Sequence, residues 1–528
     1  MSKGPPSRST VGSIGILTVL SLVGAVIAVA NTTVLVHFFG TGRAIEVCFA
    51  ATTLRMLVTQ MAQSGRLAEL LIPIYHKVET DHGRERARRV FSVILNWTVL
   101  FVIAAAGAAA LAAPWFMSYY LPGFEPEDRA LAVTMFRALA PIVVITVVQI
   151  EIRAIANAEG SFAWPESLSL LGHAVSLPVL VVLAPQYGVW AAVWCWWSGA
   201  VVGLLGLMVM LYRMGYRHRA ILRERGFSVR AFFGKLMSTS GQTTSTLVYN
   251  FVLTAALSTL PQGIYAIFQY AERVHVKTKS VALRPLSIIF LAQVSQVLAR
   301  GEKNLRGLLV PALNRTLAIV SIIVAGFSAA GHSLLVALWG LNSLSESDYA
   351  LATLLVLIQY LLLPVTGLQL VSRQTLMALG LVHRVSWLMT LAQLMSALCT
   401  WLLVAWWGTN GAIIAAAGNI LLLTLAPLVL LLLRQRNLPV WYQPSRVLCW
   451  AVAVVSGYGA GCAVRALLPG SLLEYRLGAL LVGVVVATTS MGVALAVAWL
   501  LGVYEVRQAV TRTWARVTSA RRKGGIRG

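Results

Sequence analysis

The sequence predicts an all-α polytopic membrane protein with about fourteen transmembrane helices. Hydrophobic residues fill 58% of the 528 positions, charged residues only 11%, and the mean hydropathy is +0.78. Soluble globular domains do not have this composition. The apolar residues also fall into runs of roughly 20, the length of a helix that crosses a bilayer. Basic residues gather in the short connections between the runs.

Fourteen apolar runs follow one another along the chain, and each predicts one membrane-spanning helix. They cover residues 13 to 38, 44 to 74, 90 to 113, 130 to 156, 164 to 185, 188 to 212, 236 to 260, 263 to 298, 305 to 330, 347 to 378, 383 to 406, 410 to 433, 446 to 467 and 476 to 504.

The charges predict how these helices are oriented. Lys and Arg number 42 against 18 acidic residues, a net charge of +24, and connections such as HKVETDHGRERARR after the second run are strongly basic. Loops on the other side, such as LPGFEPEDR, are neutral or acidic. By the positive-inside rule the basic loops and both termini are expected in the cytoplasm, without any need for nucleic acid binding. The five cysteines lack the spacing of metal ligands, and we expect them to be small core residues.

An internal repeat predicts two homologous bundles. Pro141 precedes Gly188 by 47 residues, and Pro364 precedes Gly411 by the same interval, within similar helix patterns. We therefore expect an N-lobe of six helices at 1–225 and a C-lobe of six at 226–445. Two further helices follow at 446–510, with a basic cytoplasmic tail at 511–528. Paired bundles around a midplane cavity are typical of transporters that work by alternating access.

The eighth predicted helix carries a cationic stripe. Arg273, Lys277 and Arg284 are spaced by four and seven residues, which places them on one helix face together with Ser280. Charge inside a membrane is expensive and marks functional sites by default. The stripe predicts a cavity that binds a phosphate-bearing anion, although Lys277 and Arg284 can alternatively reach water at the membrane end. Ser240, Gln242 and Thr243 on the seventh helix are candidates for binding sugar hydroxyls.

Four other charged or titratable residues are candidates for gating or coupling. Glu46 and Arg43 lie near the outer end of the second helix, where they form either a gate or a simple interfacial ion pair. Glu272 and His275 share the other face of the eighth helix. For Glu272 the sequence favours a structural ion pair with Lys279. His275 is either a proton-coupling group or a polar residue whose hydrogen bonds are satisfied within the fold.

Several short motifs follow one another along the chain: Phe39-Gly40-Thr41-Gly42, Gly65 with Pro73, Ala113-Pro114-Trp115, Leu121-Pro122-Gly123-Phe124, Arg137 with Pro141, and Tyr270-Ala271-Glu272-Arg273. In this order and spacing they resemble the MurJ/MviN family of lipid II flippases within the multidrug/oligosaccharidyl-lipid/polysaccharide (MOP) exporter superfamily. The resemblance implies two six-helix lobes around a cationic cavity, two C-terminal helices beside a lipid groove, and transport of an undecaprenyl-pyrophosphate-linked saccharide.

The departures from this family concern its anion site. Functional arginines of the family's first helix have no counterpart between Val11 and His37, and the arginine pair of the second helix is replaced by Thr59 and Gln60. Glu46 stands where the family has Asp, and Arg273 is retained. Arg55 lies one turn before Thr59 and can substitute for the missing pair, with Thr59 and Gln63 on its face.

We therefore expect a multi-pass protein of the bacterial inner membrane that flips an undecaprenyl-pyrophosphate-linked oligosaccharide and performs no covalent chemistry. The missing first-helix arginines favour an exopolysaccharide or other surface-glycan repeat unit. Lipid II is the alternative, and a cation-coupled multidrug exporter ranks below both. A glycosyltransferase is disfavoured because the chain has no Asp-x-Asp cluster and no sizeable soluble loop. We expect a monomer without cofactors, driven by an unidentified ion or the membrane potential, with glycan-assembly enzymes as its partners.

Overall fold

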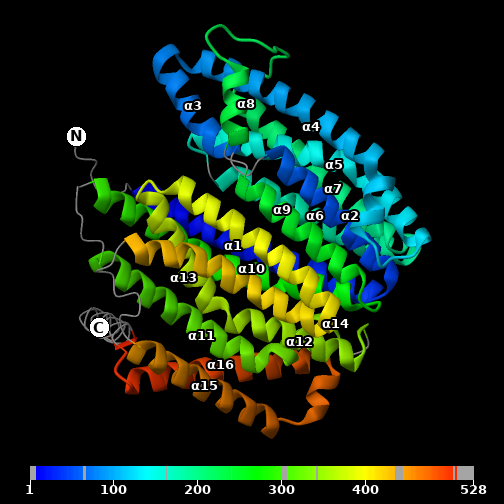
Figure 1. Cartoon of the computed structure of the whole chain (residues 1–528), viewed down its shortest axis with the longest axis vertical. Coiled ribbons are helices and arrows are strands. Elements are labelled where there is room, and N and C mark those ends of the chain that lie inside the picture. Colours follow the sequence, from blue (N-terminus) through cyan, green and yellow to red (C-terminus); the bar gives the residue numbers. More distant parts are fainter. Residues whose placement is uncertain are drawn as a thin grey trace, which may run out of the picture. The chain divides into compact units, whose positions relative to one another are not determined.

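The fold is that of a computed structural model, which describes residues 8–63, 67–161, 163–238, 241–299, 306–340, 343–434, 444–503 and 506–507. These residues form helices without β-strands, so the predicted all-α class is confirmed (Figure 1). Ten helices in the described ranges are long and apolar enough to cross a membrane. One of them, α14, contains two of the predicted spans.

The helix bounds follow the predicted runs closely. The elements are α1 Arg8–Phe39, α2 Arg43–Gln63, α3 Leu67–His82, α4 Arg84–Tyr120, α5 Pro126–Ala158, α6 Ala163–Tyr187, α7 Trp190–Arg213, α8 Val229–Ser238, α9 Gly241–Ser258, α10 Ile264–Ala299, α11 Arg306–Trp339, α12 Glu346–Leu361, α13 Leu363–Ala378, α14 Val382–Arg434, α15 Pro444–Leu467, the short 3-10 helix η2 Gly470–Glu474, and α16 Arg476–Leu500.

Three predicted runs overlap two described helices each. The run at 44 to 74 holds α2 and the first half of α3, the run at 236 to 260 holds the end of α8 and all of α9, and the run at 347 to 378 holds α12 and α13, which meet at Leu362. The runs at 383 to 406 and 410 to 433 both lie within the bounds of α14, whose backbone is non-helical at Gly408, so two helices meet there.

One of the two predicted glycine turns, at Gly188, falls where the backbone has a positive φ, and the other lies three residues from such a position. Gly188 has φ +54° between α6 and α7, as the repeat predicts. In the second half the kink is at Gly408, with φ +55°, and not at Gly411. A side chain on Gly411 would lie 1.9 Å from the carbonyl oxygen of Leu403. Gly411 thus allows close backbone packing, and Gly408 supplies the left-handed conformation.

The chain divides into two compact units, Met1–Arg273 with Thr390–Ala416, and Val274–Met389 with Ala417–Gly528. The division falls inside α10 and α14, not at the expected lobe boundary near residue 225. The predicted domain limits therefore stay a prediction.

Helix α5 is central to the first unit, where it packs against α2, α4 and α7 (Figure 1). A buried cluster formed by side chains of α3, α4, α5, α7 and α8 joins these helices, with Tyr75, Phe91, Ile155, Leu207 and Phe232 among its members. Helix α6 pairs with α7 and with α1. In the second unit α11 packs against α12, α13, α15 and α16.

Small residues let two helix pairs approach closely, as is common in membrane proteins. A side chain on Gly172 of α6 would lie 2.4 Å from the carbonyl oxygen of Gly199 on α7. In the second unit, a side chain on Gly461 of α15 would lie 2.1 Å from Oγ of Ser490 on α16. In both pairs the glycine leaves room for the neighbouring helix.

Gly172→Val should therefore force α6 and α7 apart and destabilise the protein by about 1–3 kcal/mol, the usual range for overpacking. The thermal unfolding midpoint of detergent-solubilised protein measures this. Gly107→Val on α4 is the control, because nothing lies within 4 Å of a side chain added there. Equal midpoints for the two variants would contradict the close α6–α7 contact.

Candidate functional site

Arg273 lies on the first part of α10, in the first unit, and is held against α2. Its guanidinium carbon is 4.4 Å from the centroid of the Phe49 ring. Phe49 in turn meets Tyr270 edge to face, with ring centroids 5.1 Å apart, and the Tyr270 hydroxyl donates to the carbonyl of Gly40 at 2.9 Å. Arg273 is thus positioned by stacking, and its N–H donors are not used by this contact.

Arg55 lies on α2 in the same unit and is half-buried. Its Nε is buried and has no hydrogen-bond partner in the part of the chain that the structure describes. The positive charges of Arg55 and Arg273 repel each other. The ion pairs found in the described ranges join neither arginine to a carboxylate. The two arginines therefore place two positive charges near each other without a protein counter-ion, which favours binding of an anion.

The remainder of the cationic stripe belongs to the second unit. Lys277 and Ser280 are exposed on α10. Arg284 lies on the same helix, but its side chain is outside the described residues. The stripe therefore runs along one continuous helix, and the boundary between the units follows directly after Arg273.

The candidate sugar-binding residues have mixed surroundings. Gln242 and Thr243 are half-buried on α9. Thr59 is buried and donates its hydroxyl hydrogen to the carbonyl of Arg55 at 2.9 Å, so it offers a ligand only an acceptor. Ser240 and the side chain of Gln63 lie outside the described residues. A sugar site at these positions stays a prediction.

Glu46 and Arg43 form an ion pair, with Oε2 of Glu46 2.8 Å from Nη1 of Arg43. The other carboxylate oxygen of Glu46 accepts the backbone N–H groups of Gly263 at 2.8 Å and Ala266 at 3.4 Å. These groups lie at the start of α10, so the fully buried Glu46 on α2 caps that helix. Sequence reasoning predicted the pair but missed the cap.

The loop after α4 packs against the turn that precedes α10. A side chain on Gly123 would lie 2.1 Å from the carbonyl oxygen of Ser258, so only glycine permits this approach. Arg43 lies over the ring of Phe124 in the same loop, with its guanidinium carbon 4.6 Å from the centroid. Gly263 adopts φ +95° beside Thr41. The start of α2 is thereby bound to the ends of α4 and α9.

Glu272 and His275 have different surroundings. Glu272 is exposed. His275 is buried in the second unit beside Tyr360, with ring centroids 6.2 Å apart. Within the described ranges, Nδ1 of His275 has no hydrogen-bond partner. The structure therefore favours neither of the two roles that the sequence leaves open for His275.

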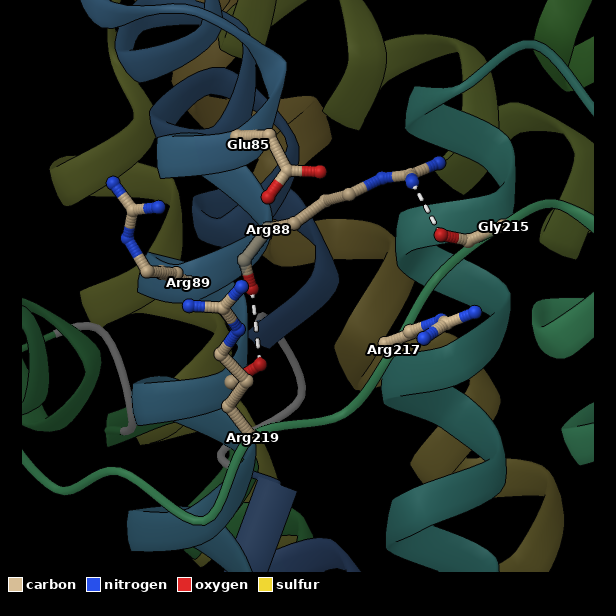
Figure 2. A pocket seen from close by; sticks show the side chains of 7 residues that line it. Glu85, Arg88, Arg89, Gly215, Arg217 and Arg219 are labelled. Carbon is tan, nitrogen blue, oxygen red and sulfur yellow. Dashed lines mark hydrogen bonds between the residues drawn. The ribbon is translucent and has the colours of Figure 1, made fainter.

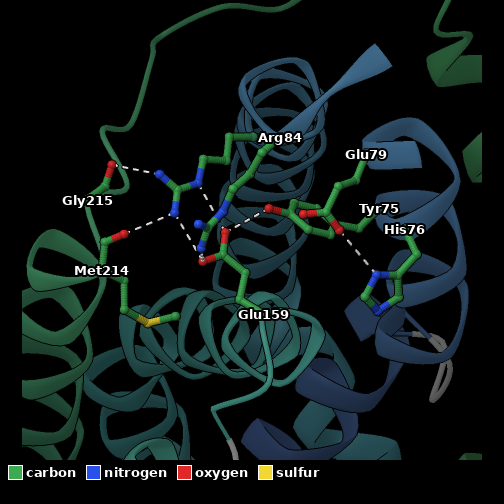
Figure 3. Close-up of polar contacts among 8 residues, drawn as sticks. Tyr75, His76, Glu79, Arg84, Glu159, Met214 and Gly215 are labelled. Carbon is green, nitrogen blue, oxygen red and sulfur yellow. Dashed lines mark hydrogen bonds and ion pairs between the residues drawn. The ribbon is translucent and has the colours of Figure 1, made fainter. Parts of the chain in front are cut away.

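A polar cluster centred on Glu159 lies at the start of α4 (Figure 3), and the sequence analysis did not predict it. The Tyr75 hydroxyl donates to its Oε1 at 2.7 Å, and Arg88 donates to both carboxylate oxygens at 3.0 Å. Arg84 also donates to Oε2. Burial would raise the pKa of Glu159, but these hydrogen bonds outweigh it and lower the pKa from 4.5 to about 2. The cluster ties α3, α4 and the end of α5 together.

Comparisons with known proteins agree on one family. Residues 35–484 match the family model described as lipid II flippase MurJ. A curated protein of Thermotoga maritima, described as a probable lipid II flippase MurJ, is 21% identical over 288 residues, which are 54% of this chain and 57% of that protein. The chain thus spans little more than half the length of the curated relatives that it matches.

Solved structures show the same fold. A lipid II flippase MurJ in an inward closed conformation superimposes with a TM-score of 0.70 at 15% identity, covering 90% of this chain and 98% of that one. An inward-facing multidrug resistance MATE family transporter of the MOP superfamily gives a TM-score of 0.60 at 15% identity, covering 80% and 95%.

Two substitutions of Glu46 should distinguish the contribution of its ion pair with Arg43 from that of its hydrogen bonds to the start of α10. Glu46→Gln keeps a carbonyl acceptor for the N–H of Gly263 but loses the charge that pairs with Arg43, so we expect a loss of about 1 kcal/mol. Glu46→Ala leaves buried N–H groups without acceptors and should lose about 2–3 kcal/mol. Thermal unfolding midpoints in detergent measure both. The helix cap is refuted if the two variants are equally stable.

The cluster around Glu159 should make stability depend on pH. Because the folded pKa is lowered to about 2, its contribution is complete above about pH 4.5 and is lost as the pH falls toward 2. Glu159→Gln should cost about 2 kcal/mol at pH 7 and less at pH 3. Unfolding midpoints at both pH values, for wild type and variant, measure this. A difference between the two proteins that does not shrink at pH 3 would argue against the assignment.

Proposed function

Because the chain belongs to the MurJ family of lipid II flippases, we propose that it moves lipid II from the cytoplasmic to the outer leaflet of a bacterial inner membrane. The single observation that carries this beyond family membership is that Arg55 and Arg273 form no ion pair with a carboxylate in the described ranges. They are suited to bind a pyrophosphate, which offers several acceptor oxygens and two or more negative charges. The activity is transport and needs no catalytic group.

The comparisons favour lipid II over the exopolysaccharide cargo that the sequence analysis preferred, because the family model and the curated relatives carry that name. The exopolysaccharide repeat unit stays a second candidate on one observation. Helix α1 has no charged residue between Val11 and His37, so the first-helix arginines that the family resemblance leads us to expect are missing. In this chain Arg55 on α2 supplies the second positive charge.

A cation-coupled drug exporter is a weaker candidate. The similarity to a MATE transporter at 15% identity is a similarity of fold and does not indicate a shared substrate. Such an exporter would need carboxylates in its cavity to bind cations and drugs. In the described ranges Arg55 and Arg273 meet no carboxylate, Glu46 is already occupied by Arg43 and by the start of α10, and Glu151 on α5 is the buried carboxylate whose oxygens have no hydrogen-bond partner there. An anionic cargo fits this arrangement better.

The proposed cycle is alternating access. The head group enters from the cytoplasm, Arg55 and Arg273 bind its pyrophosphate, Lys277 and Arg284 continue the row of cations along α10, and the lipid tail stays in the bilayer. On the predicted topology the start of α2 lies at the outer side. We propose that Arg43 and Glu46 act there as a gate that must release the start of α10. An inside-negative potential would assist the outward step by roughly 2.3 kcal/mol per charge per 100 mV. A monomer suffices.

Arg273→Ala should lower the initial rate of lipid II translocation at least about tenfold, since one charge-assisted bidentate contact is worth about 1.5–3 kcal/mol. The assay uses vesicles containing the purified protein and fluorescent lipid II, with a quencher that reaches only the outer leaflet. Arg273→Lys keeps the charge and should fall between. Arg384→Ala removes an exposed arginine and is the matched control.

The same vesicles distinguish the candidates. Transport of lipid II but not of an undecaprenyl-pyrophosphate-linked exopolysaccharide unit supports the main proposal, and the reverse supports the second. If both lipids move equally in wild type and in Arg273→Ala, the assignment of the anion site is wrong.

A further inference from the structure

A basic pocket of about 160 Å³ lies at the start of α4, outside the transport site described above. Arg88, Arg89 and Glu85 on the first turns of α4 form one wall, and Arg217, Arg219 and Gly215, which follow α7, form the other (Figure 2). A single water needs roughly 10–15 Å³ of this kind of volume, so the pocket has room for a phosphate group.

The walls of the pocket are fixed by hydrogen bonds. Arg88 donates to the carbonyls of Gly215 at 2.8 Å and Met214 at 3.0 Å, and its remaining contacts hold Glu159 (Figure 3). Asn96 of α4 donates to the carbonyls of Arg219 at 2.9 Å and Ile221 at 2.8 Å. The backbone that carries Arg217 and Arg219 is therefore anchored to α4, and the pocket exists before any ligand binds.

The charge of the pocket is not balanced by the protein. Glu159 neutralises Arg88, and Glu224 lies 3.5 Å from Arg89. In the described ranges the side chains of Arg217 and Arg219 make neither an ion pair nor a hydrogen bond. Glu85 is the acidic residue that lines the pocket, and it offsets one of these two positive charges. The N-terminus of α4 adds a positive dipole end, so the pocket favours an anion.

The pocket also adjoins exposed apolar side chains. Trp97, one turn along α4 from Ser92 in the pocket wall, is 38% exposed and donates through Nε1 to the carbonyl of Leu222, which is 44% exposed. Tyr212 at the end of α7 is 71% exposed. Tryptophan and tyrosine are typical of the membrane interface. A ligand with a charged head and an apolar chain therefore fits better than a free ion.

We propose that this pocket binds the phosphate group of an anionic phospholipid in the cytoplasmic leaflet, with Arg217 and Arg219 as the main contacts. The lipid chain lies along Trp97 and Leu222. This site is separate from the proposed cargo site, and neither proposal depends on the other. A bound lipid would hold the segment 214–222 against α4 and the membrane surface.

Binding of phosphatidylglycerol to purified, delipidated full-length protein in detergent tests the proposal, with phosphatidylcholine and inorganic phosphate measured in parallel. The double variant Arg217→Ala/Arg219→Ala should bind phosphatidylglycerol at least tenfold more weakly than wild type. The control Arg223→Ala/Arg225→Ala removes two exposed arginine side chains of the same segment that do not line the pocket and should bind as wild type does.

Three results would overturn the proposal. If both double variants lose affinity equally, the effect is one of total charge and not of the pocket. If inorganic phosphate binds as tightly as phosphatidylglycerol, the ligand is a free phosphate and not a lipid. If phosphatidylcholine binds equally well, the site does not select an anion. Unfolding midpoints of both variants identify a loss that comes from misfolding.

Discussion

Burying a charge costs free energy, and this cost distinguishes the structural charged residues of this protein from those that are candidates for binding a ligand. In an apolar interior a charge is tolerated only with a partner, and the penalty for removing that partner is several kcal/mol. Glu46 and Glu159 satisfy this condition within the protein, through Arg43 and the start of α10 in one case and through Tyr75, Arg84 and Arg88 in the other. Arg55 and Arg273 have no such carboxylate in the described ranges. Arg55 and Arg273 differ from these two glutamates in this respect and are therefore suited to bind an anionic ligand.

Glu46 and Glu159 each fasten the end of one helix to neighbouring helices. Glu46 fastens the start of α2 to the start of α10, beside the tight contact of Gly123 with Ser258. Glu159 fastens the end of α5 to α3 and α4. Both contacts lie within the first unit. Only the contact at Glu46 involves α10, the helix that continues into the second unit, which makes it the better candidate for a gate.

The sequence was sufficient to predict most helices but few of the contacts between them. Hydropathy predicts where α4, α5, α7 and α16 lie, because a membrane span needs a long apolar run whatever it packs against. The cap formed by Glu46 joins residues 217 positions apart, and the ion pair of Glu159 with Arg84 joins residues 75 apart. No local pattern carries such pairings. Arg273 and Arg55 could be selected from the sequence, because charge in an apolar helix is itself a signal, whereas the absence of a counter-ion required the structure. The sequence predicts only a basic loop around Arg217, because the shape of the pocket depends on contacts of that loop with Asn96 and Arg88 on α4.

The central claim is that Arg55 and Arg273 together bind the pyrophosphate of the cargo. A double-mutant cycle for binding of lipid II to the purified protein, with Arg55→Ala, Arg273→Ala and the double variant, tests it most directly. If both arginines grip one pyrophosphate, each single variant should bind more weakly and the two effects should be non-additive by about 0.5–3 kcal/mol. Effects that simply add, or an unchanged affinity in either single variant, would contradict the claim.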